Sequence, residues 1–199
     1  MASRKELSIK GDLSAFGAAA EAGVMLHVCC APCSGAIIEA LAKEGVRPVV
    51  FFSNSNIAPK EEYELRLREC RRYCDKYGLE LIEDEYDHCA WVAAAARGRE
   101  QEPERGSRCQ ACFRFRLLRA AREASRRGLG LLATSLASSR WKDLAQVDEA
   151  GRLACSLFPG LRWWGRNWRA GGLQQRRSEI ICEENFYNQN YCGCEFSRH

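Results

Sequence analysis

The sequence predicts an α/β fold with a mostly parallel sheet, in the three-layer arrangement of Rossmann-like and PP-loop-like proteins, and with a cysteine-rich C-terminal tail. Three observations predict it. Short apolar runs alternate with longer segments of helical period along the chain. The apolar runs are rich in valine, phenylalanine and leucine, which suits buried strands. Glycine follows several of the helical segments, where the backbone leaves a helix most easily.

The first third of the chain shows this alternation. Residues 1–22 have a mixed composition and are expected to form a polar leader. Residues 25–28 are apolar and predict a strand, after which Ser34 is a favourable N-cap for a helix that reaches residue 43. Gly45 ends that helix, and valine and phenylalanine in residues 46–53 predict the second strand.

The same alternation continues up to the C-terminal tail. Residues 54–59 have loop composition, whereas residues 60–77 have a helical period that Gly78 ends. The later elements are expected as a strand over residues 79–82, helices over 90–97 and 109–127, a strand over 131–135, and helices over 142–155 and 174–184. The tail from 186 to 197 has the composition of turns, and residues 23–199 are expected to form a single domain.

Composition narrows the functional class. The chain has 199 residues, of which 46% are hydrophobic, so a buried core is expected, and its net charge of +4 is too small to indicate a partner. Twelve cysteines would suggest disulfides in a secreted protein. However, Asp12 and Glu21 interrupt the N-terminal segment, and no apolar run is long enough for a transmembrane helix. We therefore expect a cytoplasmic protein whose clustered thiols serve metal or redox chemistry.

The first cysteine cluster lies at an expected strand-to-helix turn. Cys29, Cys30 and Cys33 fall within five residues at the carboxyl end of the first strand. Parallel sheets bind ligands beyond the carboxyl ends of their strands, and a helix N-terminus favours the thiolate form that ligates metals. The alternative is that these cysteines are small buried hydrophobic residues.

Two further cysteine pairs could complete a site. Cys109 and Cys112 form a C-x-x-C at a helix start, which suits either metal ligation or redox chemistry, and with the first cluster they offer four thiolates. Cys192 and Cys194 form a C-x-C that could ligate zinc or close a strained disulfide. Adjacent cysteines are unusual in zinc modules, which favours iron–sulfur. The remaining cysteines are interpreted as buried or incidental: Cys70, Cys74, Cys89, Cys155 and Cys182.

Charge and aromatic residues give a weaker indication of the partner. Residues 105–127 hold eight arginines against the single acid Glu123, and the tryptophans at 163, 164 and 168 are interleaved with further arginines. Such a pattern suits contacts with RNA, but it also fits a solvated basic face above core tryptophans. His27 and Asp143 are proton-donor candidates by residue type, although a histidine on an apolar strand is commonly a core residue.

Together these motifs resemble the cobalamin-independent epoxyqueuosine reductase (QueH) family, over nearly the whole chain after the leader. The matching stretches follow the family's order: LHVCCAPCS at 26–34, NSNIAPKEEYELR at 54–66, EPERGSRCQACFRFRL at 102–117, TSLASSRWKDL at 134–144, GGLQQRRSE at 171–179 and FYNQNYCGCEFS at 186–197. The loop at 53–59 departs from the family's usual Y-N-P-N-I-H-P, and an arginine common before Gln189 is missing.

The resemblance implies an oxidoreductase that reduces epoxyqueuosine to queuosine at the wobble position of tRNA, the last step of queuosine formation. It implies an external electron donor, a redox-active pair at Cys192 and Cys194, and an additional iron beside a [4Fe–4S] cluster. The cluster ligands that it implies are Cys29, Cys30, Cys109 and Cys112.

Two other function classes remain as alternatives at this stage. Four thiolates also suit a zinc-stabilised RNA-binding module without redox activity. An ATP-dependent tRNA-modifying enzyme with a PP-loop is less well matched, because the turn after the first strand has only Gly35 following Ser34 and lacks the glycines and the aspartate of that phosphate loop.

Overall fold

The computed structural model describes residues 8–197 and contains a five-stranded sheet in which every strand pairing is parallel. The strands are β1 (Val24–Val28), β2 (Val49–Phe52), β3 (Leu81–Glu83), β4 (Leu131–Thr134) and β5 (Arg162–Trp163). Their order in the sheet is β3-β2-β1-β4-β5. This order grows outward on both sides from β1, as in Rossmann-like sheets, and confirms the predicted fold class.

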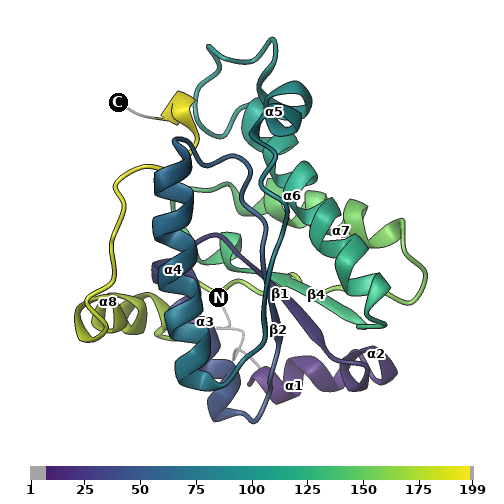
Figure 1. The fold of residues 1–199 in the computed structure, drawn as a ribbon. Helices are drawn as coiled ribbons and strands as arrows, with labels where there is room; N and C mark the ends of the chain where they lie inside the picture. Colours follow the sequence, from purple (N-terminus) through teal and green to yellow (C-terminus); the bar gives the residue numbers. More distant parts are fainter. Residues whose placement is uncertain (1–7, 198–199) are drawn as a thin grey trace, which may run out of the picture.

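Helices cover both faces of the sheet and make three layers (Figure 1). One face carries α3 (Ala31–Lys43), α4 (Lys60–Tyr77) and α8 (Leu173–Glu183), and the other carries α6 (Ser107–Arg126) and α7 (Leu144–Ser156). Parallel strands need such crossover helices, since each connection must return the chain to the same end of the sheet.

Helix α3 begins earlier than the sequence predicted. Its N-cap is Cys30, whose backbone is extended, and Pro32 occupies the first turn, where its fixed φ and missing N–H cost nothing. Ser34 is therefore inside the helix, and its hydroxyl donates a hydrogen bond to the carbonyl of Cys30 at 3.0 Å. The consequence is that Cys29 and Cys30 lie directly at the helix N-terminus.

Other elements differ from the sequence prediction in the C-terminal two thirds. The predicted helix at 90–97 is a short α-helix, α5 (His88–Trp91), followed by a π-helical turn, η1 (Val92–Ala96). Strand β5 was missed, because two residues are too few to produce a hydrophobic pattern. A 3-10 turn, η2 (Ser135–Ser138), follows β4, and another, η3 (Glu195–Ser197), lies in the tail.

The expected polar leader contains secondary structure where it is described. Two short helices, α1 (Ile9–Ser14) and α2 (Ala18–Glu21), lie beside the lower edge of the sheet in Figure 1. Ile9 is buried and belongs to the main hydrophobic core. Residues 1–7 of the expected leader lie outside the described residues.

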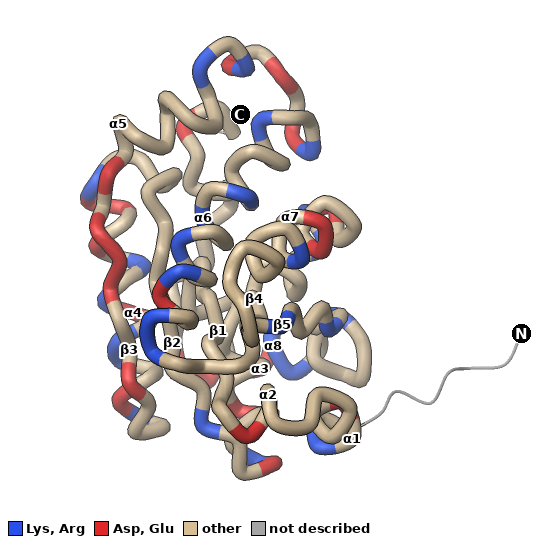
Figure 2. Tube along the Cα trace, turned by 90° about the vertical axis from the view of Figure 1, so that its right-hand side faces the viewer, with Lys and Arg blue, Asp and Glu red and all other residues tan. Residues whose placement is uncertain are grey.

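Burial explains much of the arginine and tryptophan content. Trp164 and Trp168 are core residues that pack edge to face, so the alternative interpretation of these tryptophans as core is the correct one for both. Arg108 and Arg116 are almost fully buried. Figure 2 shows basic and acidic residues distributed along residues 8–197 rather than separated into two halves.

The C-terminal tail crosses the molecule from α8 past α4 to the end of the sheet where α5 lies (Figure 1). Arg66 of α4 donates hydrogen bonds to the carbonyls of Tyr191 and Cys192, and the Tyr187 hydroxyl donates to Glu62. These contacts bring the last cysteines back toward the first strand. Within residues 8–197, no helix has both the length and the apolar character of a membrane span.

Candidate active site

The candidate site lies where the strand order reverses. Chain connections from β1 and β4 leave in opposite directions, which opens a crevice beyond their carboxyl ends, and such crevices bind ligands in α/β sheets. Cys29 follows β1 and Ser135 follows β4. The Cys29 N–H donates to the Ser135 hydroxyl at 3.0 Å, and that hydroxyl donates to the Cys29 sulfur, with the two atoms 3.3 Å apart. The two strand ends thus hold the first thiol in place.

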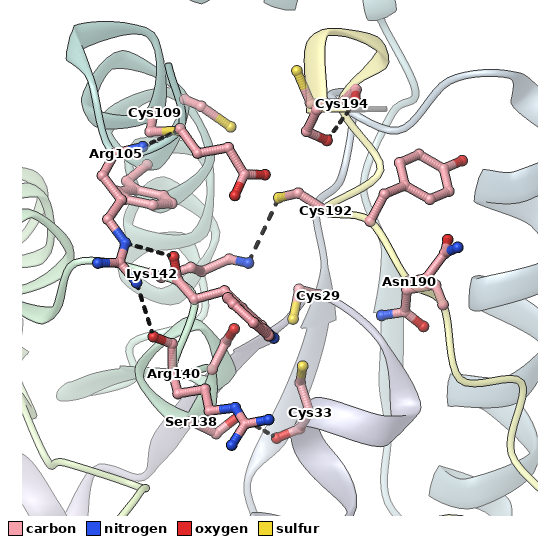
Figure 3. A pocket seen from close by; sticks show the side chains of 18 of the residues that line it. Cys29, Cys33, Arg105, Cys109, Ser138, Arg140, Lys142, Asn190, Cys192 and Cys194 are labelled. Atoms are coloured by element: carbon pink, nitrogen blue, oxygen red, sulfur yellow. Dashed lines mark hydrogen bonds between the residues drawn. The ribbon is translucent and has the colours of Figure 1, made fainter. Parts of the chain in front are cut away.

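A cavity of about 750 Å³ extends outward from this point (Figure 3). Segments far apart in the sequence supply its walls: the β1–α3 turn, the start of α6, the segment before α7, helix α8 and the tail. The cysteines that line it are Cys29, Cys33, Cys109, Cys112, Cys192 and Cys194. Cys30 is buried beside Cys29, with their sulfur atoms 3.8 Å apart.

The cysteines of the β1–α3 turn form a triad. The sulfur atoms of Cys29, Cys30 and Cys33 all lie within 4.8 Å of one another, close enough for the three to hold a metal ion. Hydrogen bonding from its two neighbours holds the pKa of Cys29 well below its ordinary value. Donation to Cys29 raises the pKa of Cys33 to about 11. The triad therefore concentrates negative charge on Cys29, the thiol at the strand end.

The second pair lies on the first turn of α6. Burial raises the pKa of Cys109 to about 11, although the backbone N–H of Arg105 donates to its sulfur at 3.3 Å. Burial likewise raises the pKa of Cys112. The Glu102 carboxylate accepts from the Arg108 N–H and the Ser107 hydroxyl, so it caps this helix and takes up the orphan donors of its first turn. Both thiols remain protonated at neutral pH without a ligand that replaces their protons.

The third pair is presented by the tail. Gly193 has φ +106°, a conformation that L side chains rarely adopt, and this turns the chain sharply between the two cysteines. Burial raises the pKa of Cys194 to about 12. Cys192 is less buried, and Figure 3 shows its sulfur directed toward Lys142. Arg66 fixes this turn by donating to the Cys192 carbonyl at 3.0 Å.

Lys142 is a site residue that sequence reasoning missed. Its ammonium donates to the Cys192 sulfur, with the two atoms 3.6 Å apart. Burial alone would lower the pKa of Lys142, but the negative charges of Cys192 and Cys29 outweigh burial and raise it above the ordinary value. Lys142 is therefore a fixed cation among the thiols. In the sequence it marked only the start of a helix, and no spacing pattern linked it to a cysteine fifty residues away.

Gln189 is a second missed residue. Its amide nitrogen donates to the Cys30 sulfur at 2.9 Å, and the side chain lines the cavity. Donation to Cys29 raises the pKa of Cys30 well above its ordinary value, so Gln189 positions a protonated sulfur and not a thiolate. The signal that could have found Gln189 is its position three residues before Cys192, in the segment between α8 and η3 that forms no helix or strand.

A buried network supports the site from below. Arg116 donates to the Ser53 carbonyl at 3.1 Å and to the Asn54 side chain, and Asn54 donates to the Val28 carbonyl at 2.9 Å. His27 is fully buried, lies 2.7 Å from the Thr134 hydroxyl and donates from Nε2 to the Ser53 carbonyl. His27 is therefore a hydrogen-bonded core residue, as the alternative interpretation held. The carboxylate of Asp143 caps α7.

The cavity walls are strongly basic. A single carboxylate-bearing residue, Glu104, is among the residues that line it. The basic residues that line it are Arg66, Arg105, Arg108, Arg116, Arg140, Lys142 and Arg177. A concave site with one sign of charge raises the local concentration of oppositely charged ligands. This cavity therefore favours an anionic ligand.

Comparison with known proteins agrees with this arrangement. A family model described as "Epoxyqueuosine reductase QueH" matches residues 24–199. The chain belongs to the epoxyqueuosine reductase QueH family. The matched range includes all three groups of cavity cysteines and the tail that carries the last of them. Membership confirms the resemblance on which the ligand and redox assignments rest.

The chain aligns with most of the length of several relatives named "Epoxyqueuosine reductase QueH". The protein of Histophilus somni (strain 129Pt) is 42% identical over 174 residues, which is 87% of this chain and 71% of the relative. That of Acinetobacter baylyi is also 42% identical over 174 residues, 87% of this chain and 79% of the relative. That of Thermotoga maritima is 33% identical over 178 residues, 87% of this chain and 89% of the relative.

Proposed function

We propose that this protein reduces epoxyqueuosine to queuosine at the wobble position of a tRNA anticodon, with a [4Fe–4S] cluster and a redox-active cysteine pair. The observation that carries the proposal is the convergence of three cysteine groups on one basic cavity at the switch point of a parallel sheet. The name of the family supplies the substrate class, and the cavity supplies thiols for two-electron chemistry.

The donor set supports a cluster rather than a single ion. One tetrahedral zinc holds all its sulfurs at about 2.3 Å, so they must lie close to one another. Among the described residues, the close group of ligand atoms contains Cys29, Cys30 and Cys33 but neither Cys109 nor Cys112. A [4Fe–4S] cube carries irons at four alternate corners, so its four thiolate ligands approach from different sides. We propose that it is held by Cys29, Cys30, Cys109 and Cys112.

The cysteine pair of the tail can supply the two electrons and two protons that the reduction requires. Removal of an epoxide oxygen breaks both of its C–O bonds, forms one alkene and requires two electrons and two protons, with water as the second product. Oxidation of the Cys192 and Cys194 thiols to one disulfide releases two electrons and two protons. An external donor then returns two electrons to the disulfide for the next turnover, and a [4Fe–4S] cluster held beside the pair would relay these electrons one at a time.

The two cysteines have different surroundings, which supports different roles. Cys192 is the less buried of the two and its sulfur lies 3.6 Å from the ammonium of Lys142, whereas burial raises the pKa of Cys194 to about 12. We propose that Cys192 is the thiol that reacts first and that Cys194 closes the disulfide. The turn at Gly193 keeps the two side chains on the same short segment.

A zinc-stabilised RNA-binding module is the second candidate. The triad of Cys29, Cys30 and Cys33 favours it, because three sulfurs within 4.8 Å of one another suit a small ion. This candidate accounts for the basic cavity, but it leaves the cysteine pair of the tail and the lysine beside Cys192 without a function. The reductase therefore accounts for more of the site.

The test is metal analysis followed by turnover. The protein is purified without oxygen, and iron, acid-labile sulfide and zinc are measured per chain. It is then incubated with epoxyqueuosine tRNA and a strong chemical reductant, and the nucleosides are separated by mass. We expect about four irons with matching sulfide and conversion to queuosine. Stoichiometric zinc without sulfide after anaerobic reconstitution, and no conversion, would favour the RNA-binding module.

A further inference from the structure

The segment between η2 and α7 carries an exposed tryptophan at the mouth of the cavity. Trp141 is 66% exposed, the highest value among the large hydrophobic side chains of the described residues, and it lines the cavity. An exposed indole that lines a concave site offers an aromatic face to a ligand that enters the site. The Arg140 guanidinium lies 5.3 Å from the centre of the Trp141 ring.

This segment is held in place although it lies at the surface. Arg169 donates to the carbonyls of Ser139 and Lys142 at 2.6 and 2.7 Å. Arg105 donates to the carbonyls of Arg140 and Trp141 at 3.3 and 3.1 Å. All four consecutive carbonyls are thus bound by two arginines. Such a segment loses little conformational freedom when a partner binds, which is the property of a preformed platform.

We propose that Trp141, flanked by Arg140, is the platform on which a nucleobase next to the reacting nucleotide of the RNA stacks. This inference rests on the proposed function. A nucleoside that enters the cavity as part of a strand brings its neighbours to the rim, and Trp141 lies on that rim. Every nucleobase has a face that stacks on an indole, and arginines beside the ring contact the adjoining phosphates.

The charge of the rim favours RNA over a protein partner. Arg105 and Arg169 hold the segment through carbonyl oxygens, so these bonds neutralise none of their positive charge. Arg140 and Arg177 add further positive charge to the lining, which has Glu104 as its one acidic residue. Stacking together with an electropositive channel is the usual means of binding single-stranded nucleic acid.

The test compares RNA binding by matched variants. The probe is a fluorescein-labelled RNA stem–loop with an anticodon-like loop, and its affinity for the full-length, anaerobically purified protein is measured by anisotropy at several salt concentrations. Trp141→Ala should weaken binding by about fivefold or more, since stacking on one base contributes about 1–3 kcal/mol. Trp141→Phe should restore most of the affinity. The salt dependence of Trp141→Ala should match that of the wild type, because no phosphate contact is removed.

Leu157→Ala is the matched control, because Leu157 is 59% exposed but does not line the cavity. It should bind like the wild type. A loss below fivefold for Trp141→Ala, or an equal loss for Leu157→Ala, would overturn the platform. The platform would also be overturned if Trp141→Ala kept RNA affinity and lost turnover only with a protein reductant, since Trp141 would then dock the electron donor.

Wild-type turnover, measured in parallel, separates this inference from the proposed function. Absence of queuosine formation together with Trp141-dependent RNA binding would remove the reductase assignment and leave the stacking platform. Queuosine formation together with unchanged RNA affinity in Trp141→Ala would support the reductase assignment and eliminate the stacking platform.

Discussion

The ammonium nitrogen of Lys142 lies 3.6 Å from the sulfur of Cys192. The two residues come from different segments, the loop before α7 and the tail, and Arg66 and Arg169 fix the backbones of both. An ammonium can only donate a hydrogen bond, so this contact is strongest when Cys192 is a thiolate. Lys142 therefore places a positive charge directly beside Cys192, the more accessible cysteine of the tail.

Substitution of Lys142 should slow reactions of Cys192. We expect Lys142→Met to decrease the alkylation rate of Cys192 by iodoacetamide at neutral pH by about tenfold, since a hydrogen bond to a charged group contributes about 1.5–3 kcal/mol. The rate is measured by mass spectrometry of the peptide that contains Cys192. Lys60→Met, which removes a lysine that is 64% exposed and remote from the cavity, is the control and should leave the rate unchanged. An equal rate in wild type and Lys142→Met would contradict the proposed contact.

Loss of Cys194 should separate the cluster from turnover. We expect Cys194→Ser to retain the iron and sulfide of the wild type and to lose queuosine formation, because a single thiol cannot close a disulfide within the chain. Iron content and turnover with a chemical reductant are measured on the same preparation. Full activity of Cys194→Ser under these conditions would eliminate the reservoir role of the pair. Cys182→Ser, at an exposed cysteine of α8, serves as the control for thiol removal.

Loss of Cys109 should remove the cluster together with turnover. Cys109→Ser is expected to reduce iron and sulfide per chain to a small fraction of the wild-type content and to abolish turnover, because a hydroxyl replaces one of four proposed thiolate ligands. The exposed Cys89 gives the matched control, and Cys89→Ser should keep its iron. Wild-type iron in Cys109→Ser would exclude Cys109 from the ligands and direct attention to Cys33, whose sulfur lies in the triad.

The sequence was most informative where local rules decide the structure. Residues 60–77 have a strong helical period and a closing glycine, and α4 occupies the same residues. The strand that precedes Cys29 was predicted over residues 25–28, and that alone indicated the correct end of the sheet for the site. By contrast, the start of α3 was misplaced, because Pro32 in the first turn decided it rather than the capping preference of Ser34.

The site itself was predictable only in its cysteines. Lys142 and Gln189 act on sulfurs that are 50 and 159 residues away in the sequence, through a path of the tail that no local pattern encodes. The same holds for Arg116, which belonged to an apparent basic face but is buried against Ser53 and Asn54, directly after β2. Arginine content alone cannot distinguish a buried cation from one that contacts phosphate.

The turn at Gly193 should be essential for the geometry of the cysteine pair. A Cβ at this position would lie 2.8 Å from Ile57 and 3.0 Å from the Arg66 guanidinium, and the φ of +106° disfavours any L side chain. We expect Gly193→Ala to lower turnover by at least about tenfold, which corresponds to about 1.4 kcal/mol, while the iron content stays unchanged. Gly45→Ala has a positive φ with open space around it and is the control. Unchanged turnover in Gly193→Ala would show that the turn tolerates displacement.

Burial of His27 should make the fold sensitive to mild acid. Burial, followed by the charge of Arg116, lowers the pKa of His27 from 6.5 to about 3. In the unfolded chain His27 therefore binds a proton near pH 6.5, whereas in the folded chain it stays neutral down to about pH 3. Its contribution to stability is complete above pH 6.5 and is lost as the pH falls from there toward 3. Between pH 7 and pH 5 the free energy of unfolding should fall by about 2 kcal/mol, above the range where carboxylates titrate.

Urea unfolding at pH 7 and pH 5 measures this loss. His27→Asn removes the titrating group, so its free energy of unfolding should be nearly equal at the two pH values, although lower than that of the wild type at pH 7. His88→Asn changes a histidine that is not part of the buried core and should keep the wild-type difference. If His27→Asn and the wild type lose the same free energy on acidification, the sensitivity arises elsewhere and His27 accepts a proton in the folded state.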